Sequence, residues 1–283
     1  MDARPKTIYL PDTMVNWPWP RTINPHYEDV KAEVNASFRD FKALSPNSQE
    51  AFNKCDFEHF RIACDLMNLF FIYDEYTDFE NDALTKNMAD IVFWARAIKS
   101  ASLSSKRHFL ETFPAYLYSV LQLRCKTVGV IPSFPILEMA IDFPDEVLYH
   151  PIIMDLAECI TDLVLIDNDM ISYNKEQVVG NKAHSIISTI MFDLGLDVSG
   201  AMAWAAHYHT EVQKRFIDGL AKVPSWGPSI DVLVKEYLDK TAMWARGNHS
   251  WSYESQRYLA TMGPEIQQNR LVPLLPSPKC RSM

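Results

Sequence analysis

The sequence is poor in glycine, with only 8 glycines among 283 residues. Glycine-rich phosphate loops, dinucleotide-binding turns and many-stranded sheets all need residues that tolerate positive φ, so this scarcity argues against each of them. The sequence also lacks an excess of positive charge, since its formal net charge is −9. A chain of this charge is a poor candidate for a nucleic-acid partner or for electrostatic attachment to an anionic membrane.

Cysteine is sparse and irregularly placed. The five cysteines are odd in number and never form a C-x-x-C pair. This pattern argues against a disulfide framework or a zinc site and fits small buried side chains in a reducing compartment. Apolar runs such as 66–73 and 163–166 are too short to span a bilayer, and the first residues have no apolar leader. We therefore expect a cytoplasmic protein with no membrane partner.

The hydrophobic fraction is 48%, which is enough for a substantial core. Segments with the pattern of amphipathic helices follow one another, with capping and stop signals between them. The alternation of apolar and polar residues that is typical of β-strands is not sustained anywhere. Helices are expected at about 24–43, 57–73, 87–124, 152–178, 182–194, 198–222 and 230–262. Proline-rich segments flank them as an N-terminal arm (1–23) and a tail (272–283). The pattern predicts an all-α protein with one domain over 1–283.

A group of carboxylates follows the apolar segment that ends at Tyr73: Asp74, Glu75 and Asp78. On a helix, Asp74 and Asp78 point the same way, and Glu75 lies beside Asp78. Carboxylates this close repel one another unless a cation lies between them, and Mg²⁺ prefers such oxygen ligands. An acidic helix end exposed to water would explain the same string, so this motif alone leaves both interpretations open.

A second polar set lies on the helix expected at 152–178. Asn168, Ser172 and Glu176 are spaced four residues apart, so an amide oxygen, a hydroxyl and a carboxylate share one helical stripe. All three are oxygen ligands suited to Mg²⁺, and the neighbouring Lys175 could offer a point charge to a phosphate. The polar face of an ordinary amphipathic helix is the alternative, but the regular spacing after an apolar stretch favours a metal site.

A third feature lies near the C-terminus. Arg257 and Tyr258 combine a guanidinium fork with a phenolic hydroxyl, which suits the oxygens of a diphosphate. For an isolated pair, a helix end with its arginine in solvent is the better explanation. Trp244 and Trp251 lie just upstream, and packing in the core accounts for at least one of them.

The three motifs, in this order on an all-α chain, resemble those of class I terpene synthases. The sequences at 10–13, 17–20, 24–27, 64–68 and 251–258 are most similar to fungal sesquiterpene cyclases of mushrooms, in particular the protoilludene synthase group. The resemblance covers most of the chain. It implies a helical bundle around a central apolar cavity, in which farnesyl diphosphate is ionised and cyclised and diphosphate is released.

The resemblance also implies roles for the motif residues and a cofactor of three Mg²⁺ ions, with Mn²⁺ as an alternative. By similarity, oxygen ligands hold the ions in two groups: Asp74 and Asp78 for two ions, and Asn168, Ser172 and Glu176 for the third. A diphosphate-binding group is implied as well: Lys175, Arg257 and Tyr258. No side chain is expected to act as a nucleophile. Aromatic faces stabilise carbocations, and the expected cavity wall is Phe70, Phe71, Trp244, Trp251 and Tyr253.

Compared with the family, we expect the chain to lack residues at three places, directly after residues 61, 78 and 132. In the family, the last interval holds an arginine that senses the diphosphate, whereas residues 133–142 contain no arginine. Arg124 lies upstream but matches another family position, so the sensing role is not assigned to it. Two alternatives therefore stay open beside the cyclase: an acyclic alcohol synthase of the nerolidol or linalool type, and a shortened, non-catalytic paralogue or splice form. The expected partner of the cyclase, and equally of the alcohol synthase, is a prenyl diphosphate of ten or fifteen carbons.

Overall fold

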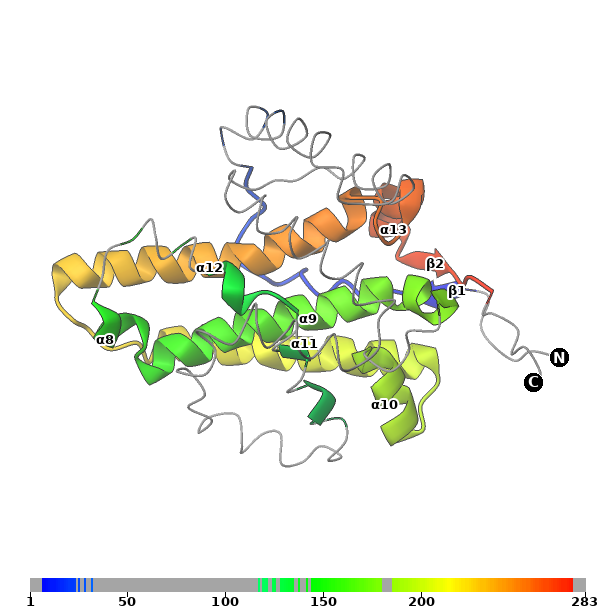
Figure 1. The fold of residues 1–283 in the computed structure, drawn as a ribbon, viewed down its shortest axis with the longest axis horizontal. Helices are drawn as coiled ribbons and strands as arrows, with labels where there is room; N and C mark the ends of the chain where they lie inside the picture. Colours follow the sequence, from blue (N-terminus) through cyan, green and yellow to red (C-terminus); the bar gives the residue numbers. More distant parts are fainter. Residues whose placement is uncertain are drawn as a thin grey trace, which may run out of the picture.

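The computed structural model describes residues 7–23, most of 117–179 and 185–276. Figure 1 shows the arrangement of its elements. In chain order they are β1 (Thr7–Tyr9), the 3-10 helix η1 (Ile131–Ser133), α8 (Asp145–Leu148), α9 (Pro151–Val179), α10 (Ile186–Leu194), α11 (Val198–Leu220), α12 (Pro228–Glu254), the 3-10 helix η2 (Ala260–Met262), α13 (Gly263–Asn269) and β2 (Leu271–Pro273). The helices predicted at 24–43, at 57–73 and over most of 87–124 lie outside the described residues.

The long helix α9 is the centre of the described bundle. Its 29 residues contain no glycine, and its one proline is the first residue, so nothing interrupts the helical hydrogen bonds. The side chains from Leu163 to Ile166 are all buried, and both α11 and α12 pack against the helix. Figure 1 shows α9 lying between them. A helix that is buried on nearly every side belongs in the interior of a bundle, and α9 confirms the helix predicted at 152–178.

The helices α10 and α11 begin and end at signals present in the sequence. Gly195 ends α10 in the left-handed conformation, with φ of 64°. Asp197 caps α11 by accepting the backbone N–H of Gly200 at 2.8 Å. Within the part of the chain that the structure describes, no single helix is long and apolar enough to cross a membrane; α10 and α11 pass only as a pair, which is bent by 111°.

The helix predicted over 230–262 is wrong at its C-terminal end. α12 stops at Glu254, and a turn follows in which Gln256 has a positive φ of 59°. Within this turn, the backbone N–H of Arg257 donates to the hydroxyl of Ser255 at 3.4 Å. Such a local contact competes with the helical hydrogen-bond ladder. The predicted arginine–tyrosine pair therefore lies on a turn beyond the helix.

The helix α13 packs closely against the end of α12 because it begins with a glycine. A Cβ atom at Gly263 would lie 1.8 Å from the carbonyl oxygen of Tyr253. We expect Gly263→Ala to lower the free energy of unfolding by about 3 kcal/mol, because the opposing atom is backbone and cannot rotate away. Chemical denaturation measures the loss. Gly247→Ala is the control, since nothing lies within 4 Å of a Cβ there; equal stability of the two variants would contradict the close approach.

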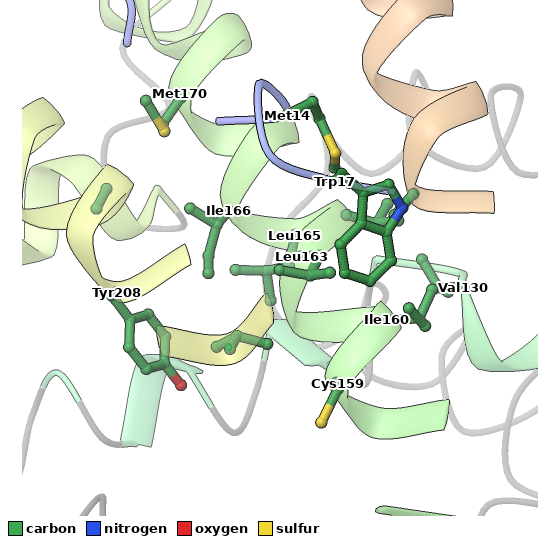
Figure 2. Packing of buried hydrophobic residues seen from close by; sticks show 14 of the residues in the cluster. Met14, Trp17, Val130, Cys159, Ile160, Leu163, Leu165, Ile166, Met170 and Tyr208 are labelled. Carbon is green, nitrogen blue, oxygen red and sulfur yellow. The ribbon is translucent and has the colours of Figure 1, made fainter. Parts of the chain in front are cut away.

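The N-terminal arm, residues 7–23, runs between α9 and α12 (Figure 1). β1 pairs antiparallel with β2, so the arm begins beside the C-terminal segment. The guanidinium of Arg246 on α12 then donates to the backbone carbonyls of Met14, Trp17 and Trp19 at 2.8–3.0 Å. Met14 and Trp17 belong to the same buried cluster as the aliphatic side chains of α9 (Figure 2). The arm is thus part of the core of the described bundle.

Candidate active site

The predicted oxygen ligands on α9 form one stripe along the helix. Asn168 and Glu176 are half-buried, whereas Ser172 is only 3% exposed. The hydroxyl of Ser172 has no hydrogen-bond partner among the described residues. A buried hydroxyl without a partner costs free energy, and binding a cation through its oxygen would remove that cost.

This donor set fits a hard divalent cation. The described ranges contain no group of three His, Cys, Asp or Glu side chains placed to hold a metal ion. The stripe instead combines one amide oxygen, one hydroxyl and one carboxylate, which are ligands that Mg²⁺ accepts and soft transition metals do not favour. The orphaned hydroxyl of Ser172 lies in the middle of the stripe and supports the same conclusion.

The side chain of Asn168 connects this stripe to the turn after α12. Its Nδ2 donates to the hydroxyl of Tyr258 at 2.9 Å, across 90 positions of sequence. The guanidinium of Arg257 lies 5.7 Å from the ring centroid of Tyr258. The ring of Trp251 meets the same ring edge-on, with centroids 5.9 Å apart. The structure therefore brings the second and third sequence motifs together at one place.

Arg124 is a residue of this site that sequence analysis left without a role. Its guanidinium donates to Oδ1 of Asn168 at 3.4 Å and forms an ion pair with the buried carboxylate of Asp169. Asp169 also accepts the backbone N–H of Ile186 at 2.7 Å, at the start of α10. No periodicity links positions 124 and 169, so spacing could not have revealed the pair. The acidic residue directly after Asn168 was the one hint in the sequence.

The described residues of the predicted aromatic wall lie in three different places. Trp251 lies at the site, while Trp244 packs edge-on against Phe134, with ring centroids 6.2 Å apart. Tyr253 lines a small hollow together with Thr13 of the arm; its ring lies 5.2 Å from that of His249, and its hydroxyl accepts a hydrogen bond from Arg270. Lys175 is half-buried next to Glu176 on α9. Four predicted site residues lie outside the described residues: Phe70, Phe71, Asp74 and Asp78.

Two small hollows lie between α9 and the arm. Both are lined by Met170 and Ile171, and the side chains fill them so closely that neither has room for more than about one water molecule. Met170 lies two residues from both Asn168 and Ser172, which places it on the opposite face of the helix. Pockets that enclose a small-molecule ligand usually measure about 300–1,000 Å³. These hollows are therefore distinct from the site on the ligand stripe.

Comparison with known proteins identifies the family. The family model "Terpene synthase family 2, C-terminal metal binding" matches residues 56–215. Sesquiterpene synthase 14 of Postia placenta is 42% identical over 334 aligned positions, which cover 99% of this chain and 95% of that protein. The chain belongs to the terpene synthase family. Delta(6)-protoilludene synthase 18 of the same fungus is 44% identical, with 95% of this chain and 93% of that protein covered.

Solved structures show that this terpene synthase shares the fold of distant relatives. The linalool/nerolidol synthase of Streptomyces clavuligerus matches with a TM-score of 0.60 at 14% identity, over 83% of this chain and 98% of that chain. Hedycaryol synthase, in complex with HEPES, matches with a TM-score of 0.65 at 15% identity, over 88% and 99%. The predicted all-α class I terpenoid synthase fold is confirmed.

This terpene synthase is also shorter than its relatives. The alignment with sesquiterpene synthase 14 extends over 334 positions although the chain has 283 residues, so the relative carries residues that this chain lacks. The shortening expected from the sequence is thus confirmed, and the positions of the missing blocks stay a prediction. The matching family domain is described as metal-binding, in agreement with the oxygen ligands on α9.

We expect Tyr258→Phe to weaken turnover by this terpene synthase without abolishing it. The substitution removes the hydroxyl that accepts from Asn168 and keeps the ring that packs on Trp251. A hydrogen bond of this kind contributes about 1 kcal/mol, which corresponds to a loss of about fivefold in kcat/KM. Steady-state release of diphosphate measures the change, with Tyr149→Phe at the exposed end of α8 as the control. A loss above about 100-fold would contradict a purely orienting role for the hydroxyl.

Proposed function

We infer that this terpene synthase is a sesquiterpene cyclase, which ionises farnesyl diphosphate and closes the resulting cation to a cyclic product. The relatives named sesquiterpene synthase 14 and Delta(6)-protoilludene synthase 18 support this substrate and product class. The observation that carries the proposal is the hydrogen bond between Asn168 and Tyr258, which joins the ligand stripe of α9 to the turn that contains Arg257. Metal ligands and diphosphate ligands are then neighbours.

The metal-binding part of the mechanism is assigned to two sets of oxygen ligands. Asn168, Ser172 and Glu176 would hold one Mg²⁺ ion, and Asp74 and Asp78 would hold two more. When bound, Mg²⁺ supplies positive charge that stabilises the departing diphosphate. The side chains of Lys175 and Arg257 add cationic groups for the diphosphate oxygens, and Tyr258 holds the amide of Asn168 in place.

The remaining groups at the site handle the carbocation. Breaking an allylic C–O bond leaves a cation that water would capture, so the hydrocarbon chain must be enclosed by apolar surface. The buried ring of Trp251 lies beside Tyr258 and offers an aromatic face next to the diphosphate-binding turn. Aromatic faces stabilise cations through their quadrupole. The reaction needs no nucleophilic side chain.

Incubation of the purified full chain with farnesyl diphosphate and Mg²⁺ tests the proposal. Gas chromatography–mass spectrometry of the volatiles should show a cyclic sesquiterpene hydrocarbon, in the class that includes protoilludene. An acyclic alcohol would instead identify a synthase of the nerolidol type. A shortened, non-catalytic form is the second candidate, because the relatives carry residues that this chain lacks. Absence of diphosphate release from a protein with a helical circular dichroism spectrum would establish that form.

A further inference from the structure

The buried carboxylate of Asp167 lies at the junction of four segments. It is 2% exposed, and it directly precedes Asn168 on α9. Its Oδ1 accepts the hydroxyl of Thr13 from the arm at 2.6 Å. Its Oδ2 lies 3.2 Å from Nδ1 of His249 on α12, and Nε2 of His209 on α11 lies 3.5 Å from its Oδ1. One side chain thus connects the arm and three helices.

We propose that Asp167 is a positioning residue, which fixes the rotation of α9 so that Asn168 faces the turn after α12. The inference rests on the proposed function, because it assigns Asn168 to metal binding. It adds a residue outside the three sequence motifs, on a different face of the helix from the ligand stripe.

The geometry of a helix is the first support for this role. Successive side chains on an α-helix differ by about 100° in direction, so Asp167 and Asn168 are turned by one rigid rotation. A rotation that moved Asp167 away from its partners would also move Asn168 away from Tyr258. α9 is therefore bound to α12 by Asp167 with His249 inside the bundle, and to the turn after α12 by Asn168 with Tyr258 at the site.

The cost of burying a charge is the second support. A carboxylate inside a protein is unfavourable unless hydrogen bonds and opposite charge compensate it. Here the hydroxyl of Thr13 donates to the carboxylate at 2.6 Å, and the imidazoles of His249 and His209 lie 3.2 and 3.5 Å from its oxygens. Burial of the carboxylate is compensated only when α9 places it next to these partners. Asp167 therefore favours one rotation of the helix, which an apolar core residue would not do.

Hydrogen bonds from α11 and α12 fix the backbone of the arm next to Asp167. Nε2 of Gln213 on α11 donates to the backbone carbonyl of Thr13 at 2.8 Å. Arg246 on α12 donates to the carbonyl of Met14, the next residue, at 2.9 Å. The hydroxyl of Thr13 is therefore presented to Asp167 by backbone that α11 and α12 fix in place.

The test measures metal affinity directly, because a merely structural role would not change it in a folded protein. Binding of Mn²⁺ to the full chain with inorganic diphosphate is followed by electron paramagnetic resonance. We expect Asp167→Asn to weaken Mn²⁺ binding about tenfold or more, in the range found when a residue that supports a metal ligand is replaced. Asp239→Asn is the control, since it neutralises the carboxylate on α12 that accepts a hydrogen bond from Trp19 of the arm and does not touch α9.

A second pair of variants keeps the test decisive if Asp167→Asn does not fold. Thr13→Val removes the hydroxyl without changing the side-chain volume, and Thr13→Ser keeps it. We expect the valine variant to bind Mn²⁺ about threefold more weakly and the serine variant to bind like wild type. Unchanged affinity in every folded variant would overturn the positioning role. Failure of the wild-type chain to bind Mn²⁺ would overturn the proposed function itself, which is a different result.

Discussion

Replacing Asn168 with alanine is expected to abolish terpene formation while the protein stays folded. The side chain is half-buried, so its removal leaves no large cavity. It nevertheless connects the ligand stripe to the Arg257–Tyr258 turn, because its Nδ2 donates to the hydroxyl of Tyr258 at 2.9 Å. The substitution removes an oxygen ligand and this connection together. We expect turnover to fall by at least ~100-fold, as it does when a group that stabilises developing charge is deleted.

The matched control for this variant is Asn174→Ala. Asn174 is an amide on the same helix, but it faces the C-terminal segment, where its Nδ2 donates to the carbonyl of Pro273 at 2.9 Å. Both variants are compared by circular dichroism, by Mn²⁺ binding and by the yield of volatile product. Loss of product in Asn168→Ala, with product retained in Asn174→Ala, is the expected outcome. Equal yields from the two variants would rule out a metal ligand at position 168.

The sequence predicts the helices best where local signals are strong. α9 could be predicted because it has no internal helix breaker, and α10 because Gly195 ends it. The end of α12 could not be predicted, because the break depends on a hydroxyl contact within the turn and on the close approach of Gly263 to the backbone of Tyr253. The β1–β2 pairing was also missed, because three residues per strand are too few to show alternation.

For the site, sequence spacing is sufficient only within one helix. The stripe of Asn168, Ser172 and Glu176 follows from helical periodicity alone. The partners that reach it across the fold do not, because a long-range contact depends on how helices pack and not on their own patterns. The ion pair of Arg124 with Asp169 and the contacts of Asp167 are of this kind. Asp167 and Asp169 are the two residues next to Asn168 in the sequence, yet their partners on other segments cannot be predicted from helical spacing.

Arg257→Gln is expected to have the second large effect, mainly on the affinity for the diphosphate. The guanidinium lies on the turn after α12, 5.7 Å from the ring of Tyr258, and the hydroxyl of that ring is bound to Asn168. A charged donor at this place is close to the ligand stripe. Hydrogen bonds to charged groups contribute about 1.5–3 kcal/mol each. A fork that makes one or two of them predicts a fall in kcat/KM of about 100-fold.

The control for Arg257→Gln is Arg21→Gln at the same end of α12. Arg21 forms an exposed ion pair with Glu254 at 2.9 Å, and such surface pairs contribute little to stability. Binding of inorganic diphosphate with Mn²⁺, measured by calorimetry, should weaken in Arg257→Gln and stay unchanged in Arg21→Gln, with equal melting temperatures for both. A neutral side chain at position 257 that leaves diphosphate affinity intact would show that this arginine packs on Tyr258 and does not bind the substrate. In that case Lys175, directly before Glu176 on α9, would be the next residue to test.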